Sequence, residues 1–431
     1  MNISKKMQSV MVRHAISIIL LTCSFSSSVL AQTLSETIDA AISTHPSIKA
    51  SKANVRASRE AIPQAKAPYR PQVSANASIS SSDRKTRFEN APENQTKTSP
   101  TSTSIEINQL IYSGGMKPVV KKQAQLQVRQ AHTQLDATQL SLKNNVANAY
   151  IRHIYNIEAL NTQNEIATIT QEQIASAEAR FRSGIGSQTD VFQLQSRYFA
   201  IRAQLYEAQN AVELSKQELH SLSSKVIMQP QWPDISVLPI ISMQHAKQLA
   251  QKVSPQLESA KTSEKIAYLN YLAAKRRNKP QVSLNLSATS SSESSPLLEK
   301  DEDLRAVLGL SVPLYTGGRA SSEKRQAAAE RLSARYDKRS IQREVDLSVT
   351  NAWLNRQSTL EQLKIQEERT SIAEQALKGV ESTKAAGLLS ITDVLNATEE
   401  LQNAKLALLA AKRNYTLASI ELALLTGNPN F

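Results

Sequence analysis

The residue types that most often do chemistry are few in this 431-residue chain and form no working arrangement. No two of the six histidines have the spacing of metal ligands, and the only cysteine is Cys23. There is no phosphate-binding loop and no Gly-x-Ser-x-Gly nucleophile elbow. The sequence therefore predicts no catalytic residue, no metal site and no cofactor. The histidines are His14, His45, His132, His153, His220 and His245.

One pair of aspartates is an exception, because it lies in a repeated motif. Thr189-Asp190-Val191 recurs 203 residues later as Thr392-Asp393-Val394. Each aspartate follows a serine by three positions, which fits a helix capping box, and an acidic residue in a first helical turn also favours the helix dipole. The functional alternative is a ring of aspartates that narrows a pore and binds or selects cations. Both interpretations remain open at this point.

The same shift of 203 residues relates other parts of the chain. Tyr112-Ser113-Gly114-Gly115 recurs as Tyr315-Thr316-Gly317-Gly318, and Gly184 recurs as Gly387. In each copy 68 residues separate the paired glycines from the lone glycine. Equal spans of this length indicate that one long, rigid element was duplicated.

The N-terminus resembles a secretory signal. Residues 1–31 begin with basic residues, continue with a short apolar run and end with small residues at a cleavage site. Cys23 would leave with this segment, and Thr22 before it disfavours lipidation. The mature chain then has no cysteine, so its stability cannot come from disulfides. The net charge of +13 comes from Lys and Arg scattered among acids, which indicates a solvated basic surface and no nucleic-acid partner.

Proline and glycine placement predicts very long helices. Proline is absent from 119–229 and from 314–428, so helices can run through both stretches without a break. A helix of 68 residues is roughly 100 Å long, far more than a globular core needs. The expected long helices are about 116–183 and 319–386, and the expected return helices are about 187–225 and 390–427.

A strand-like pair precedes each long helix. Residues 72–112 and 281–315 contain segments in which apolar and polar residues alternate, the weak signature of a strand in an outer-membrane barrel. We expect solvent-facing loops at 83–100 and 291–303. Four strands cannot close a barrel, and open edges are not tolerated in lipid, so several chains must share one barrel.

The expected domain organisation follows from these elements. Residues 1–31 form the signal peptide, 32–225 the first repeat and 241–431 the second repeat, with a proline-rich linker at 226–240. The fold class is mainly α with a small β part: a duplicated strand hairpin followed by very long helices.

These motifs together resemble the TolC family of outer-membrane efflux and secretion channels, over almost all of the mature chain. The resemblance implies a homotrimer whose 12-stranded β-barrel lies in the outer membrane of a Gram-negative cell. An α-helical tunnel would continue the barrel through the periplasm. A periplasmic adaptor (membrane fusion protein) would dock at the tip, linked to an inner-membrane transporter that supplies the energy.

The resemblance also implies roles for single residues. It places the strand-to-helix junctions at the paired glycines and an interfacial aromatic ring at the two tyrosines before them: Tyr112, Gly114, Gly115, Tyr315, Gly317 and Gly318. It places the adaptor-docking tips at Ser183, Gly184, Ile185, Ala386, Gly387 and Leu388. It places the pore constriction at Asp190 and Asp393, with Asn396 where the family often has a second acid. Leu389 and Lys384 replace the Arg and Tyr involved in the family's gate, so the lock is not assigned.

Two functions from different classes are compatible with these features. The first is an outer-membrane exit duct with passive conduction and a gated tip. Efflux of small molecules is preferred over type I secretion of polypeptide, although the sequence does not separate the two. The second is a periplasmic coiled-coil adaptor or scaffold without a pore. Such a scaffold needs neither the alternating strand pairs nor the near-exact duplication.

Overall fold

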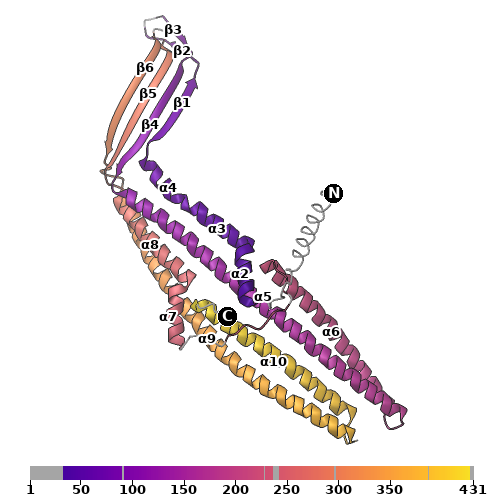
Figure 1. Ribbon diagram of the computed structural model, residues 1–431. Helices are drawn as coiled ribbons and strands as arrows, with labels where there is room; N and C mark the ends of the chain where they lie inside the picture. The colour runs from indigo at the N-terminus through magenta and orange to yellow at the C-terminus, as the bar shows by residue number, and fades with distance from the viewer. Residues whose placement is uncertain are drawn as a thin grey trace, which may run out of the picture.

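The computed structural model describes residues 33–89, 92–227, 229–235, 242–295, 298–386 and 388–427, without the side chains of 293–295, 298 and 385. The expected signal peptide with Cys23, residues 228 and 236–240 of the expected linker, and Gly387 lie outside the described residues. The protein is elongated, with a β-sheet at one end and two long helical hairpins that run away from it (Figure 1).

The helices occur in two matched sets. The first set comprises α2 (Leu34–Thr44), α3 (Pro46–Arg59), α4 (Ala61–Lys66), the 3₁₀ turn η1 (Ala67–Tyr69), α5 (Met116–Arg182) and α6 (Gln188–Ser223). The second comprises α7 (Met243–Val253), α8 (Pro255–Arg276), α9 (Arg319–Ala385) and α10 (Ile391–Thr426). Both long helices have 67 residues and both return helices have 36. None of the helices in the described ranges is long and apolar enough to cross a membrane.

The four main strands form one antiparallel sheet in the order β1-β4-β5-β6. Its strands are β1 (Gln72–Ile79), β4 (Thr101–Ser113), β5 (Gln281–Ser295) and β6 (Leu298–Ser311). The central pairing, β4 with β5, joins the first repeat to the second, with Ile105 opposite Ala288 and Ile107 opposite Leu286. The outer edges of β1 and β6 have no partner strand among the described residues.

The register gives the sheet two different faces. Successive side chains alternate between faces, so opposite partners share one. One face carries apolar residues from all four strands, and the other is mainly polar. The apolar face includes Val73, Ile107, Leu284, Leu286, Leu308 and Leu310, and the polar face includes Ser74, Glu106, Asn285, Ser287, Arg305 and Val307. The exposed fraction is 69% for Leu308 and 66% for Val73, so the apolar face is uncovered in the single chain.

The prediction of loops at 83–100 and 291–303 is partly wrong. Within the expected loop 83–100, β2 (Ser82–Thr86) pairs with β3 (Asn94–Thr98) as a separate two-stranded sheet. In the second repeat β5 and β6 extend into the expected loop 291–303. A ladder exposed to water on both sides needs no apolar face, and Ser and Thr side chains do not interrupt it. Polarity alone was therefore a poor guide to the ends of these strands.

The expected second strand also ends earlier than Tyr315. Strand β6 stops at Ser311, whereas β4 continues through Tyr112 to Ser113. Position 313 is proline, which has no N–H to donate to a ladder, and the equivalent position of the first repeat is Leu110. Tyr315 therefore lies after the strand, with 86% of its surface exposed, while Tyr112 lies within one.

A short segment after the first repeat is bound tightly across the helices. The hydroxyl of Tyr150 in α5 donates to the carbonyl of Gln231 at 2.9 Å and accepts from its N–H at 3.0 Å. Trp232 donates its indole N–H to Glu158 at 2.6 Å, and the Lys412 ammonium of α10 lies 4.4 Å from the Trp232 ring centre. We call residues 229–235 the strap, because it contacts helices of both repeats.

His153 is buried between α5 and α6, where its Nδ1 lies 2.9 Å from the hydroxyl of Ser215. The pKa of His153 is lowered, first by burial and then by the nearby Lys216 ammonium, while Glu213 acts in the opposite direction. The folded chain therefore favours neutral imidazole at this position.

We predict that acidification weakens the helical region through His153. An unfolded histidine binds a proton near its ordinary pKa of about 6.5, but the folded one resists protonation. Stability is therefore complete above that pH and falls as the pH decreases toward the lowered folded pKa. Thermal unfolding followed by far-UV circular dichroism should show this loss between neutral pH and pH ~5. His153→Gln should reduce the loss, whereas the exposed control His220→Gln should retain it; equal pH profiles for all three proteins would contradict the prediction.

Candidate functional site

The turn between α5 and α6 ends the first helical hairpin in an exposed tip. Gly184 has φ +76°, a left-handed conformation that favours glycine, and nothing lies within 4 Å of where a Cβ would be. The N–H groups of Ile185 and Gly186 both donate to the carbonyl of Arg180, at 3.0 and 3.1 Å. Glycine is required here by the backbone rather than by space. The Ser183 hydroxyl caps the helix end by donating to Ala179 O at 3.1 Å.

The second hairpin ends in a similar tip between α9 and α10. The N–H of Leu388 donates to the carbonyl of Thr383 at 3.3 Å, and that of Ala386 to Ser382 at 3.3 Å. The described parts of both tips present an exposed aliphatic side chain, with 74% of Ile185 and 77% of Leu388 accessible.

The capping box expected at Asp393 is present. The Ser390 hydroxyl accepts the N–H of Asp393 at 3.3 Å, and the Asp393 carboxylate accepts the Ser390 N–H at 2.9 Å and its hydroxyl at 2.7 Å. These hydrogen bonds, led by that of the side chain, lower the pKa of Asp393. The carboxylate thus caps α10 and keeps its negative charge.

The prediction of a matching capping box at Asp190 is wrong in part. The Ser187 hydroxyl accepts the N–H of Thr189 at 3.1 Å, one residue earlier than in the second repeat. Within the described residues no hydrogen bond joins the Asp190 side chain to Ser187. Because the Ser187 hydroxyl accepts the N–H of Thr189 and not that of Asp190, the two reciprocal hydrogen bonds of a capping box do not form. Asp190 is left available for other contacts.

A cation lies close to Asp190. The pKa of Lys384 in α9 is lowered by partial burial and then by the charge of Arg180, while Asp190 and Glu381 raise it. Lys384 and Asp190 come from different hairpins, so this electrostatic interaction links the two tips of one chain. Leu389 is partly exposed, and Asn396 lies exposed one turn after Asp393. Lys384 stands out in the sequence because it replaces a Tyr of the family's gate. Its interaction with Asp190 joins residues of different repeats and could not be predicted from the sequence.

The strand-to-helix junctions differ between repeats. All four junction glycines have positive φ, from +59° to +80°. A Cβ on Gly114 would lie 2.3 Å from Cβ of Lys279, and the Arg276 guanidinium donates to Gly115 O at 2.6 Å. Gly317 and Gly318 have nothing within 4 Å of an added Cβ. The first junction is covered by the second repeat, whereas the second junction is open in the single chain.

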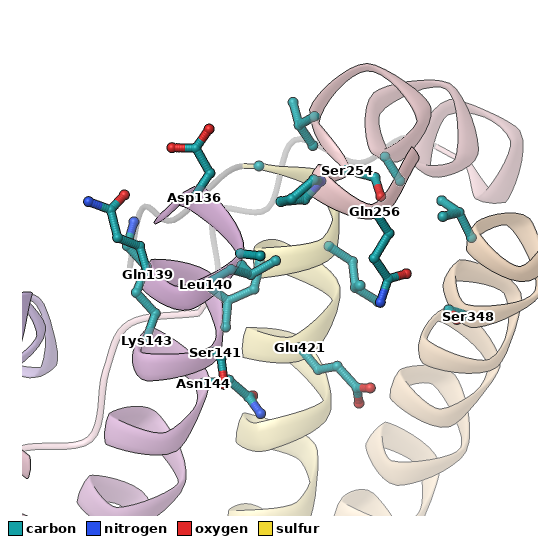
Figure 2. A pocket seen from close by; sticks show the side chains of 18 residues that line it. Asp136, Gln139, Leu140, Ser141, Lys143, Asn144, Ser254, Gln256, Ser348 and Glu421 are labelled. Carbon is teal, nitrogen blue, oxygen red and sulfur yellow. The ribbon is translucent and has the colours of Figure 1, made fainter. Parts of the chain in front are cut away.

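A cavity of about 490 Å³ lies where α10 ends beside the junction of α7 and α8, between α5 and α9 (Figure 2). Its labelled polar residues include Asp136, Lys143, Gln256 and Glu421. Among the described residues, no hydrogen bond or ion pair joins Asp136, Lys143 and Glu421 to one another. No three metal-ligating side chains come together anywhere in the described part of the chain. The cavity therefore offers no catalytic arrangement.

Comparison with known proteins identifies the architecture. The family model described as outer membrane efflux protein matches residues 37–224 and 246–428, which cover both repeats. The chain belongs to the outer membrane efflux protein family. Members of this family are transport ducts of the outer membrane, not enzymes, so the expected location and the absence of catalysis both agree with the family.

Individual relatives agree with the family assignment. Outer membrane efflux protein BepC of Brucella suis is 27% identical over 412 residues, which are 92% of this chain and 86% of BepC. Outer membrane protein TolC of Vibrio cholerae is 26% identical over 92% of this chain and 91% of TolC. The proteases secretion protein PrtF of Dickeya chrysanthemi is 27% identical over 60% of this chain and 58% of PrtF.

The fold agrees as well. The solved structure of the transmembrane channel CusC superposes with a TM-score of 0.79, covering 91% of each chain at 18% identity. The expected fold class, mainly helical with a smaller sheet, is that of the outer membrane efflux proteins.

We predict that the two return helices differ in their dependence on the capping serine. Ser390→Ala removes the acceptor of one hydrogen bond and the donor of another, and should destabilise the first turn of α10 by about 1 kcal/mol. Ser187→Ala, the matched control, removes a single bond and should cost less. Hydrogen exchange measured by mass spectrometry on peptides that start each helix tests this. Equal acceleration at the two helix starts would show that the reciprocal box adds nothing.

Proposed function

We propose that this protein is a homotrimeric exit duct, through which cargo delivered by an inner-membrane transporter and a periplasmic adaptor leaves the cell by passive conduction. The observation that carries the proposal is the four-stranded sheet with two unpaired edges and an uncovered apolar face. The same reasoning supports a division into two repeats, 32–225 and 241–431.

The edges require partners if the apolar face contacts lipid. Hydrocarbon offers no hydrogen bonds, so the outer N–H and C=O groups of β1 and β6 must pair with other strands. The internal pairing of β4 with β5 already joins a first repeat to a second one. Pairing β6 with β1 of a neighbouring chain would repeat that junction. Three chains closed in this way give a barrel of twelve strands, with the polar face as its lumen.

The helix tips are the proposed gate and docking site. Asp190 and Asp393 stand at the start of the return helices, where three chains would bring six carboxylates together around an axis. We assign Ile185 and Leu388, with the small residues Ser183, Gly184 and Ala386 beside them, to the adaptor contact. The interaction of Lys384 with Asp190 supports a role in holding the two hairpins of one chain closed.

Efflux of small molecules is the preferred cargo class. The relative BepC, whose name describes an efflux protein, aligns with 92% of this chain. The match to PrtF, named for protease secretion, keeps type I export of polypeptide as the second candidate. Co-purification after crosslinking in the native membrane would identify the adaptor and transporter, and thereby decide between the two cargo classes.

We predict that the two faces of β6 respond in opposite ways to charge. Leu308→Asp places a carboxylate on the apolar face, where a charge that contacts the bilayer is destabilising. The variant should be depleted from the outer-membrane fraction and should form fewer trimers. Val307→Asp, one residue away on the polar face, should insert and assemble normally. A wild-type chain that fractionates as a periplasmic monomer would overturn the proposed duct.

We also predict that the tip aspartates control block by multivalent cations. Asp393 keeps its charge within the cap, whereas Asp190 interacts electrostatically with the Lys384 ammonium. In planar-bilayer recordings with hexamminecobalt on the tip side, Asp393→Ala should weaken block more than Asp190→Ala. Asn396→Ala should leave it unchanged. If neither aspartate variant alters the block, both residues act only in helix capping.

A further inference from the structure

The packing between the two repeats provides a template for the contact between chains. Within one chain, α10 of the second repeat packs against α5 and contacts α6 of the first. We call this contact the internal seam. A shift of 203 residues maps α5 onto α9, α6 onto α10, and α10 onto α6 of another copy. The internal seam therefore has an equivalent in which α6 of one chain packs against α9 and α10 of the next.

Specific polar contacts cross the internal seam. The Lys405 ammonium of α10 lies 2.8 Å from the Glu165 carboxylate of α5. The buried Gln402 amide donates to Gln163 at 3.0 Å and to Gln204 at 2.9 Å. These contacts fix the register of α10 against the first hairpin.

The equivalent surfaces on α6 and α9 are bare in the single chain. On α6, Phe192, Phe199 and Tyr206 recur every seven residues, with 58%, 64% and 60% of their surfaces exposed. The counterpart of Phe199 in α10 is Gln402, which is buried, and those of Phe192 and Tyr206 are Leu395 and Leu409, which are half-buried. A stripe of apolar side chains with this spacing is typical of a helix that packs against another helix.

Helix α9 carries a matching stripe. Leu354, Ile365 and Ile372 are exposed by 54%, 60% and 63%. The residues of α5 that correspond to the first two, Ile151 and Thr162, are buried within the chain. Both apolar stripes are more exposed than the equivalent positions of the other repeat, which indicates that a second copy covers them.

We propose that a second copy of this chain packs its α6 against α9 in the register of the internal seam, and that Arg202 of the partner subunit pairs with Glu368. This inference rests on the proposed homotrimer and adds its residue-level contacts. Arg202 corresponds to Lys405 and Glu368 to Glu165, so the charges of the observed ion pair are conserved with the same polarity. Glu368 has no ion pair among the described residues.

The two seams differ in their centres. Phe199 occupies the position of Gln402, and Ala407 that of Gln204, so the partner's Phe199 replaces a buried glutamine network by an aromatic contact. Gln402 in the internal seam and Phe199 in the seam between chains thus make the two seams chemically different. Insertion of α6 into the internal seam would leave the buried amide of Gln163 without its partner, which disfavours incorrect packing within a chain.

The test uses cysteine pairs in the full-length protein, in which Cys23 is the only native cysteine. Arg202→Cys with Glu368→Cys should give covalent dimers and trimers in membranes treated with a short bifunctional thiol reagent. The spacing of an arginine–glutamate pair is too long for a direct disulfide. Lys405→Cys with Glu165→Cys should crosslink within one chain only. The mismatched pair Arg202→Cys with Glu165→Cys should yield no crosslinked oligomer above the level of the unsubstituted protein.

Charge reversal gives a second measurement that needs no reagent. Arg202→Glu or Glu368→Arg alone should lower the trimer fraction in mild detergent several-fold, and the double reversal should restore it. A trimer without the specific crosslink and without rescue would overturn this register while leaving the duct intact. A monomer in native membranes would instead overturn the proposed function itself.

Discussion

The decisive constraint on this protein is the backbone hydrogen bonding of its sheet. Strands β1 and β6 end a four-stranded array that carries apolar residues on one face, and in the proposed membrane setting lipid would not satisfy their outer N–H and C=O groups. Each edge strand therefore needs a partner strand to complete its backbone hydrogen bonds. The pairing of β4 with β5 demonstrates how the two halves fit, because it already joins the end of one repeat to the start of the other.

The long helices depend on the same repeated geometry. Each of the two strand-to-helix junctions requires two consecutive residues with positive φ, and glycine supplies them at both places. From there 67 residues run without interruption to a tip that again uses left-handed backbone at Gly184. The equal lengths of α5 and α9 place the two tips so that the charges of Lys384 in one hairpin and Asp190 in the other interact.

Much of this fold could be predicted from the sequence, because duplication, proline-free spans and paired glycines act through the backbone. The helices α5, α6, α9 and α10 lie close to the expected ranges for that reason. The ends of the strands were harder. Pro313 shortens β6 relative to β4 through one missing N–H, and the Ser- and Thr-rich loop 83–100 forms its own ladder. The tip chemistry was hardest, since the half-formed cap at Ser187 and the approach of Lys384 to Asp190 depend on tertiary packing.

The strap has a mechanical consequence. In it, Gln231 and Trp232 join Tyr150 and Glu158 of α5 to Lys412 of α10. At the equivalent level of α9 and α6 the positions of Tyr150 and Lys412 are Trp353 and Gln209, which offer neither the hydroxyl nor the ammonium that hold the strap. In a closed ring of chains, the stiff contacts within each chain would then alternate with more compliant contacts between chains. In the proposed trimer the six quasi-equivalent hairpins would respond to radial strain with threefold periodicity, and dilation would concentrate at the contacts that lack the bonds of Tyr150 and Lys412.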